Sequence, residues 1–149
     1  MIMPFKRYFD YQGRSRRMEY WSFFLLNMIV TVVLYGILFG VGGGMEAMMN
    51  SDPTDPTAAF GAMFGGVGIL ILLWALATFI PNIMLNIRRL HDRDMSGWWL
   101  LGLIIGSMIP FIGIIVSIAY LVLMFLPGTP GPNRFGPDPK DPSSAEVFS

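Results

Sequence analysis

The amino-acid sequence predicts an all-α fold, a polytopic bundle of transmembrane helices. Of the 149 residues, 54% are hydrophobic and 13% are charged, whereas a soluble domain has roughly 25% charged residues. The charged residues also occur in clusters, and none lies between Asp94 and Arg134. Long uncharged apolar stretches between charged clusters are typical of membrane spans. In lipid, such a span must satisfy its backbone hydrogen bonds internally, as a helix does.

Two apolar stretches each predict one long span. Residues 20–41 and 66–87 have the length of about 20 residues that a helix needs to cross the hydrocarbon core. Tyr20 and Trp21 begin the first span, where aromatic rings anchor a helix at the membrane interface. The first stretch is longer than the roughly 7–15 apolar residues of a signal peptide, so we expect an uncleaved span.

The third apolar stretch, residues 98–126, has two possible structures. A single helix of that length would measure about 43 Å, which is too long for the core without strong tilt. Pro110 and Gly113 lie near its centre, where proline removes a backbone donor and glycine permits a turn. The alternatives are one kinked span, giving three helices, or a short helical hairpin, giving four. We favour the hairpin.

Lys and Arg counts predict the orientation, because they are enriched in cytoplasmic loops. Residues 1–19 contain five, the 88–97 loop contains three, and the acidic 42–60 loop contains none. We therefore expect the N-terminus and the 88–97 loop to be cytoplasmic and the 42–60 loop to be outside. With a hairpin, the tail returns to the cytoplasm. The chain then has a basic and aromatic N-terminal segment (1–19), a transmembrane domain (20–126) and a Pro- and Gly-rich tail (127–149).

Composition also excludes several classes of function. The formal net charge is zero, so no overall positive field suggests a nucleic acid partner. The chain has no Cys and one His, His91, which argues against a thiolate or multi-histidine metal site. We expect no metal, no cofactor and no catalytic residue.

The first polar motif is GRSRRMEYW, residues 13–21. Ser15 is the expected N-cap of the first span, and Glu19 lies in the first turn, where a carboxylate suits the helix dipole. Three arginines should lie at the level of the lipid phosphates: Arg14, Arg16 and Arg17. They either fix the topology or bind an anionic headgroup or the acidic segment of a partner.

The second polar motif is RRLHDRDMSGWW, residues 88–99. Arg88 and Arg89 end the second span, where cations suit the carbonyl end of the dipole. His91 and Asp92 are adjacent and could in principle serve acid–base chemistry. Neighbouring loop residues rarely orient each other as a catalytic pair needs, so we favour a salt-bridged cytoplasmic turn.

Polar residues within the spans recur at helical spacing. Buried amides and hydroxyls in lipid need partners, so such faces should point into the bundle. Their expected role is hydrogen bonding between helices, and a solute path is the alternative. The spacing of four residues predicts one such face on each span, made of Asn27 and Thr31 on the first and Thr78, Asn82 and Asn86 on the second.

The tail LPGTPGPNRFGPDP, residues 126–139, is rich in turn-forming residues. If the third stretch is a hairpin, Asn133 and Arg134 emerge beside the two arginine clusters. Clustered guanidinium groups need counter-charges, so we expect the tail to fold back onto the 88–97 loop or the 14–19 segment. The candidate cytoplasmic polar cap is Arg14, Arg16, Arg17, Glu19, Arg88, Arg89, His91, Asp92, Asn133 and Arg134.

Together the three motifs resemble a bacterial family called domain of unknown function 805. The similarity covers roughly residues 5 to 139, with the motifs in the family's order, and Phe135 stands where the family often has Tyr. The resemblance implies a small bacterial inner-membrane protein and no established activity.

Three functional hypotheses follow from these observations. The first is a non-enzymatic accessory or scaffold protein that acts through an arginine-rich cytoplasmic face. The second is a small oligomeric transporter or channel, and the third is a lipid-handling enzyme that uses His91 and Asp92. The expected partners are the lipid bilayer, anionic phospholipid headgroups, which arginine matches as a bidentate donor, and an unidentified membrane protein.

Overall fold

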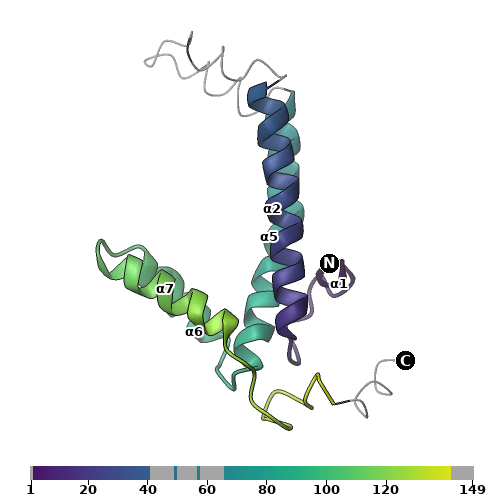
Figure 1. Ribbon diagram of the computed structural model, residues 1–149, viewed down its shortest axis with the longest axis vertical. Helices are drawn as coiled ribbons and strands as arrows, with labels where there is room; N and C mark the ends of the chain where they lie inside the picture. The colour runs from purple at the N-terminus through teal and green to yellow at the C-terminus, as the bar shows by residue number, and fades with distance from the viewer. Residues whose placement is uncertain (1, 41–48, 50–56, 58–65, 142–149) are drawn as a thin grey trace. The chain divides into compact units, whose positions relative to one another are not determined.

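The protein is an all-α chain, as the sequence predicts (Figure 1). The computed structural model describes residues 2–40, 49, 57 and 66–141, and these contain helices and turns but no sheet. The predicted 42–60 loop, apart from residues 49 and 57, and the last eight residues lie outside the described residues. The helices are α1 (Met3–Lys6), α2 (Arg17–Gly40), α5 (Val67–His91), α6 (Trp98–Ser107) and α7 (Ile112–Phe125).

The two long helices match the two predicted spans. α2 and α5 have 24 and 25 residues, and both are apolar enough over 18 residues to cross a membrane. The chain divides into two compact units, one made of residues 1–23 and 81–149 and the other of residues 24–80. In the second unit, α2 and α5 run in opposite directions (Figure 1). All the polar motifs of the sequence lie in the first unit.

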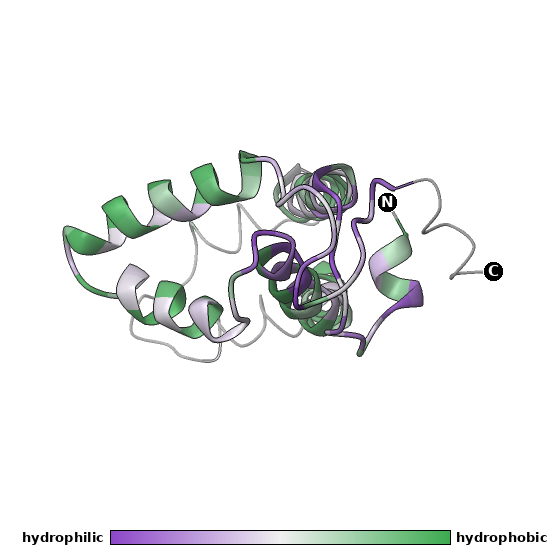
Figure 2. Cartoon of the chain, turned by 90° about the horizontal axis from the view of Figure 1, so that it is seen from below, coloured by the Kyte–Doolittle hydropathy of each residue, from purple (hydrophilic) through white to green (hydrophobic). Residues whose placement is uncertain are grey.

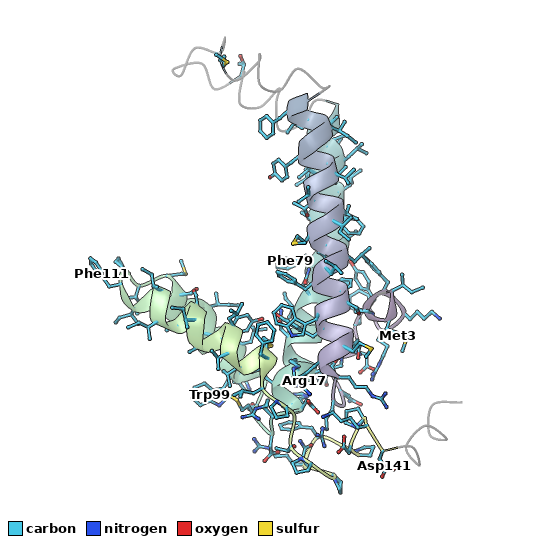
Figure 3. All side chains as sticks on the ribbon, in the orientation of Figure 1. Met3, Arg17, Phe79, Trp99, Phe111 and Asp141 are labelled. Carbon is cyan, nitrogen blue, oxygen red and sulfur yellow. The ribbon has the colours of Figure 1, made fainter. Side chains whose placement is uncertain are left out.

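The third apolar stretch forms the predicted hairpin, because α6 and α7 pack against each other and run in opposite directions. Phe111 has a left-handed backbone with φ of 65° and lies at the tip of the hairpin (Figure 3). Gly113 is required here, because an added Cβ would overlap the backbone oxygen of Ser107. With 10 and 14 residues, the two helices measure about 15 and 21 Å, less than the roughly 30 Å of the hydrocarbon core.

The apolar core of the first unit lies where both ends of the hairpin meet α5. Its buried centre consists of Leu90, Leu100 and Met124. Trp21 from α2 stacks on Phe125 at the end of α7, with 4.1 Å between the ring centroids. This packing brings the end of α7 to the end of α5, so the tail emerges beside the 88–97 loop. Figure 2 shows hydrophilic residues gathered in these connecting segments, whereas α6 and α7 are largely hydrophobic.

Candidate functional site

The centre of the predicted polar cap is the carboxylate of Asp92, which pairs with two arginines. Arg14 donates from Nε to Asp92 Oδ1 at 3.0 Å, and Arg89 donates from Nη1 to Oδ2. The three side chains are almost completely buried, with 1%, 3% and 0% exposure for Arg14, Asp92 and Arg89. Burial of three charges is tolerable only when each is paired and hydrogen-bonded, which is what this geometry provides.

The same two arginines hold the backbone of the tail. Arg14 donates to the carbonyl oxygens of Gly131 at 2.6 Å and Thr129 at 2.5 Å. Arg89 donates from Nη2 to the carbonyl oxygen of Met124 at 3.2 Å and to that of Leu126. The last carbonyls of a helix have no partner within it, so Arg89 completes the end of α7. Both cations are therefore bound by internal acceptors, and of their nitrogens Arg89 Nε has no hydrogen-bond partner in the described part of the chain.

The tail folds back onto the 88–97 segment, as predicted, and residues 88–91 of this segment are the last residues of α5 and not loop. Thr129 donates its backbone N–H to the carbonyl oxygen of Asp92 at 2.8 Å. Asn133 donates from Nδ2 to the carbonyl oxygen of His91 at 2.9 Å. Arg134 forms an exposed ion pair with Asp94, with 3.1 Å between Nε and Oδ1. The tail is thus held at three points, by the backbone of Thr129 and by the side chains of Asn133 and Arg134.

Phe135 packs on the one histidine of the chain. Its ring is stacked on the imidazole of His91, with 3.9 Å between the centroids and an angle of 3° between the planes. His91 Nδ1 lies 3.3 Å from the carbonyl oxygen of Gly13. Because that oxygen can only accept a hydrogen bond, the proton of a neutral ring belongs on Nδ1 and Nε2 carries the lone pair.

A second buried ion pair joins the start of α2 to the end of α5. Arg88 donates from Nη2 to Glu19 Oε1 at 3.2 Å and is fully buried. Its Nε and Nη1 have no hydrogen-bond partner among residues 2–40 and 66–141. Glu19 also accepts from the hydroxyl of Ser15 at 2.6 Å, and the backbone N–H of Ser15 donates to the carbonyl oxygen of Arg88 at 3.2 Å.

The prediction of Ser15 as the N-cap of the first span is wrong by one residue. α2 begins at Arg17, and the carbonyl oxygen of Arg16 accepts the first helical hydrogen bond, from Tyr20 at 3.2 Å. The hydroxyl of Ser15 donates to the carboxylate of Glu19, a charge-assisted hydrogen bond. Ser15 is nevertheless completely buried, as a link between the two helices.

Arg16 and Arg17 lie on the surface of the polar cap, away from Asp92. Arg16 donates to the carbonyl oxygen of Pro139, and Arg17 donates to that of Phe125 at 3.2 Å. Both side chains are exposed. Of the ten predicted cap residues, these two therefore remain accessible to a partner on this face, together with Arg134.

The predicted polar faces of the spans form hydrogen bonds of two kinds. In the first unit, Asn86 accepts from the hydroxyl of Tyr120 on α7 and donates to the carbonyl oxygen of Asn82 at 2.9 Å, so Asn86 links two helices as predicted. In the second unit, Thr78 donates to the carbonyl oxygen of Trp74 in its own helix at 2.8 Å. Asn27 and Thr31, also in that unit, are half-buried.

Two carboxyl groups of the first unit have lowered pKa values. Burial raises the pKa of Asp10, but the Arg7 side chain at 2.7 Å and the backbone N–H of Gln12 at 2.9 Å together hold it below its usual value of 3.8. The pKa of Asp138 is lowered by hydrogen bonds from two backbone N–H groups, those of Lys140 and Gly131. Both groups are therefore ionised at neutral pH and add fixed negative charge beside the arginines.

Sequence reasoning did not find Thr129, Arg93 or Tyr120. Arg93 donates to the carbonyl oxygen of Pro127, and Thr129 accepts from Asn133 while its backbone binds Asp92. Backbone carbonyl acceptors have no sequence signature, so these contacts required coordinates. Tyr120 was detectable because it and Ser117 are the two residues with a hydroxyl in this apolar helix, and a hydroxyl needs a partner in lipid.

Comparison with known proteins places the chain among inner membrane proteins. The family model described as "Protein of unknown function (DUF805)" matches residues 8–137. The chain is 42% identical over 135 residues to inner membrane protein YhaH of Escherichia coli strain K12, covering 91% of each protein. It is 38% identical over 135 residues to inner membrane protein YhaI of the same strain, covering 91% of this chain and 90% of that protein. No solved structure matches the chain.

Proposed function

We propose a function from the premise that this chain belongs to the DUF805 family of proteins of unknown function and is a multi-pass inner membrane protein. It is a non-enzymatic accessory or scaffold protein, and the polar cap is the surface through which it binds a membrane protein partner. The cap faces the cytoplasm, because Lys and Arg are concentrated in the segments that form it. In this proposal the 1–19 segment and the 127–149 tail act together, as the parts of the chain outside the 20–126 transmembrane domain.

The observation that carries this proposal is the internal use of the charged groups. Asp92 accepts hydrogen bonds from both Arg14 and Arg89. It is therefore not available as a general base in an enzyme that uses His91 and Asp92. A catalytic base has to reach the proton that it abstracts, and a buried carboxylate between two guanidinium groups cannot do so. The network instead fixes the shape of the cap, which is what a binding surface requires.

The charge of the cap indicates the chemistry of its partner. Residues 2–40 and 66–141 contain ten Lys and Arg but six Asp and Glu, so the excess is four positive charges. Arg16 and Arg17 lie on the exposed edge of this surface. We therefore propose that the partner presents an acidic cytoplasmic segment, because complementary charge speeds association and fixes register.

Photo-crosslinking in native membranes tests the proposal. A photoreactive amino acid at Arg17 should give a discrete protein adduct, whereas the same group at Phe111, at the hairpin tip, should give lipid adducts. Asp92→Asn should abolish the Arg17 adduct by releasing the tail. The scaffold proposal would be refuted by the absence of a protein adduct at Arg17, or by equal yields of protein adduct at Arg17 and Phe111.

The orientation is tested separately, by cysteine labelling. Because the chain has no cysteine of its own, each introduced cysteine is the single labelled position. Cysteines introduced as Asp55→Cys and Asp94→Cys are treated with a membrane-impermeant thiol reagent in intact cells. We expect labelling of the first variant, and labelling of the second only after the inner membrane is permeabilised. Labelling of Asp94→Cys but not Asp55→Cys in intact cells would place the polar cap outside.

A further inference from the structure

A pocket of about 710 Å³ lies beside the polar cap, between the N-terminal segment, the 88–97 loop, the tail and helices α5 and α6. Its volume falls within the roughly 300–1,000 Å³ of small-molecule sites. The buried ion pairs of Asp92 and Glu19 take no part in its walls. Two kinds of surface line it, and the difference between them identifies its occupant.

One wall of the pocket is polar and comes from the connecting segments and the last residue of α5. It includes Gln12, His91 and Arg134. The guanidinium group of Arg134 lies over the ring of Phe135, 4.7 Å from its centroid, and is held there by Asp94 through Nε and Nη2. Its third nitrogen, Nη1, has no partner in the part of the chain that the structure describes, so a fixed cationic donor remains available to a ligand.

The other wall is apolar and comes from α5 and α6. Ile83 and Ile87 of α5 and Leu101 of α6 form it, and Trp98 lies at its edge. Trp98 is 77% exposed at the first residue of α6, in the position where tryptophan marks the boundary between headgroups and acyl chains. The pocket therefore extends across the boundary between the polar and the apolar regions of the bilayer.

We propose that this pocket binds one glycerophospholipid with an anionic headgroup. The phosphate would accept from Arg134, and an acyl chain would lie along Ile83, Ile87 and Leu101. A ligand that satisfies both walls at once has to be amphipathic, and the surrounding bilayer supplies such molecules at high concentration. The positive excess of the cap favours an anionic headgroup, as basic pockets at the cytoplasmic ends of membrane helices generally do. This site goes beyond the proposed scaffold role and does not depend on it.

Lipid binding to the purified protein tests the site, with native mass spectrometry in detergent as the measurement. The probes are phosphatidylglycerol and diacylglycerol of the same acyl composition, of which the second lacks a phosphate. Wild type should retain one phosphatidylglycerol with about tenfold higher affinity than diacylglycerol, the scale of one hydrogen bond to a charged group. Addition of inorganic phosphate should not displace the lipid, because phosphate cannot use the apolar wall.

Two variants separate the two walls. Leu101→Trp fills the apolar side and should weaken binding of both lipids at least tenfold, whereas Leu121→Trp, a matched change on α7 outside the pocket, should not. Arg134→Gln should remove the preference for the anionic lipid and leave diacylglycerol binding unchanged, whereas Lys6→Gln should preserve the preference. Circular dichroism verifies that each variant remains helical.

Three results would overturn the site. They are equal affinity of wild type for the two lipids, equal effects of Leu101→Trp and Leu121→Trp, and displacement of the lipid by inorganic phosphate. None of these results depends on a protein partner. Failure of the scaffold proposal and failure of the lipid site can therefore be told apart.

Discussion

Replacement of Asp92 by asparagine is expected to release the tail and destabilise the first unit. The carboxylate pairs with two arginines with 1% and 0% exposure. Removal of one partner from a buried ion pair costs about 3–5 kcal/mol, because it leaves a buried charge without compensation. Asparagine keeps one oxygen that can accept from one arginine, so we expect the lower end of this range, about 3 kcal/mol.

Thermal unfolding in detergent measures this change. For a chain of this size, each kcal/mol corresponds to roughly 2–4 °C in Tm, so Asp92→Asn should lower Tm by roughly 6–12 °C. Limited trypsin digestion should show faster cleavage after Arg134 and Lys140, because the tail loses the contacts that protect it. Both measurements report on the same network from different positions.

Asp94→Asn provides the matched control in the same loop. Its ion pair with Arg134 is exposed, at 47% and 60% of the two side chains, and exposed pairs contribute about 0–1 kcal/mol. This variant should lower Tm by no more than a few degrees. If Asp92→Asn and Asp94→Asn have equal Tm values and equal rates of tail cleavage, the buried network does not hold the tail and the reasoning is refuted.

Three further predictions concern the hairpin, the helix contacts and the tail. Gly113→Ala should destabilise the hairpin by about 1–3 kcal/mol, because its Cβ would overlap a backbone oxygen, whereas Gly102→Ala should not, since nothing lies within 4 Å of its Cβ; equal Tm values would contradict this. Asn86→Leu loses its link to Tyr120 and should cost about 0.6–1.7 kcal/mol, which the Tm in detergent measures; an unchanged Tm would show that the link contributes nothing. The lowered pKa of Asp138 adds stability above its unfolded value of 3.8, and this is lost as pH falls through the folded pKa. Asp138 accepts hydrogen bonds from the backbone N–H groups of Gly131 and Lys140. Hydrogen exchange of these two groups should therefore be constant from pH 7 to 5, after correction for intrinsic rates, and increase only below about pH 4. An increase near pH 6 would point to another group.

The architecture followed from hydropathy because a bilayer fixes the length of its helices. The two long stretches matched one helix each, and the 98–126 stretch was too long for one span and interrupted at Pro110. The N-cap of α2 was harder to predict from the sequence, because the hydroxyl of Ser15 can serve two purposes. It can accept from a backbone N–H as a helix cap, or it can donate to a nearby carboxylate. Its choice depends on where Glu19 lies once α5 has placed Arg88 beside it.

The composition of the polar cap was predictable, but its internal connections were not. Charge balance required that the arginines find carboxylates, and it predicted that Asn133 and Arg134 contact the loop. It could not decide which arginines share Asp92, since several lie at similar distances along the chain. The carbonyl oxygens of Thr129 and Gly131 were also beyond sequence reasoning, because every residue has such an acceptor.

The contact between the tail and the 88–97 loop is the central feature of this structure, and a cysteine pair tests it most directly. The variant carrying Asp94→Cys and Arg134→Cys is treated in native membranes with a short thiol-specific crosslinker, followed by mass spectrometry of the digested chain. We predict a crosslink within one chain in high yield, and none for the control pair Asp94→Cys with Phe111→Cys. Equal yields for the two pairs, or crosslinks of the first pair only between chains, would contradict the folded-back tail.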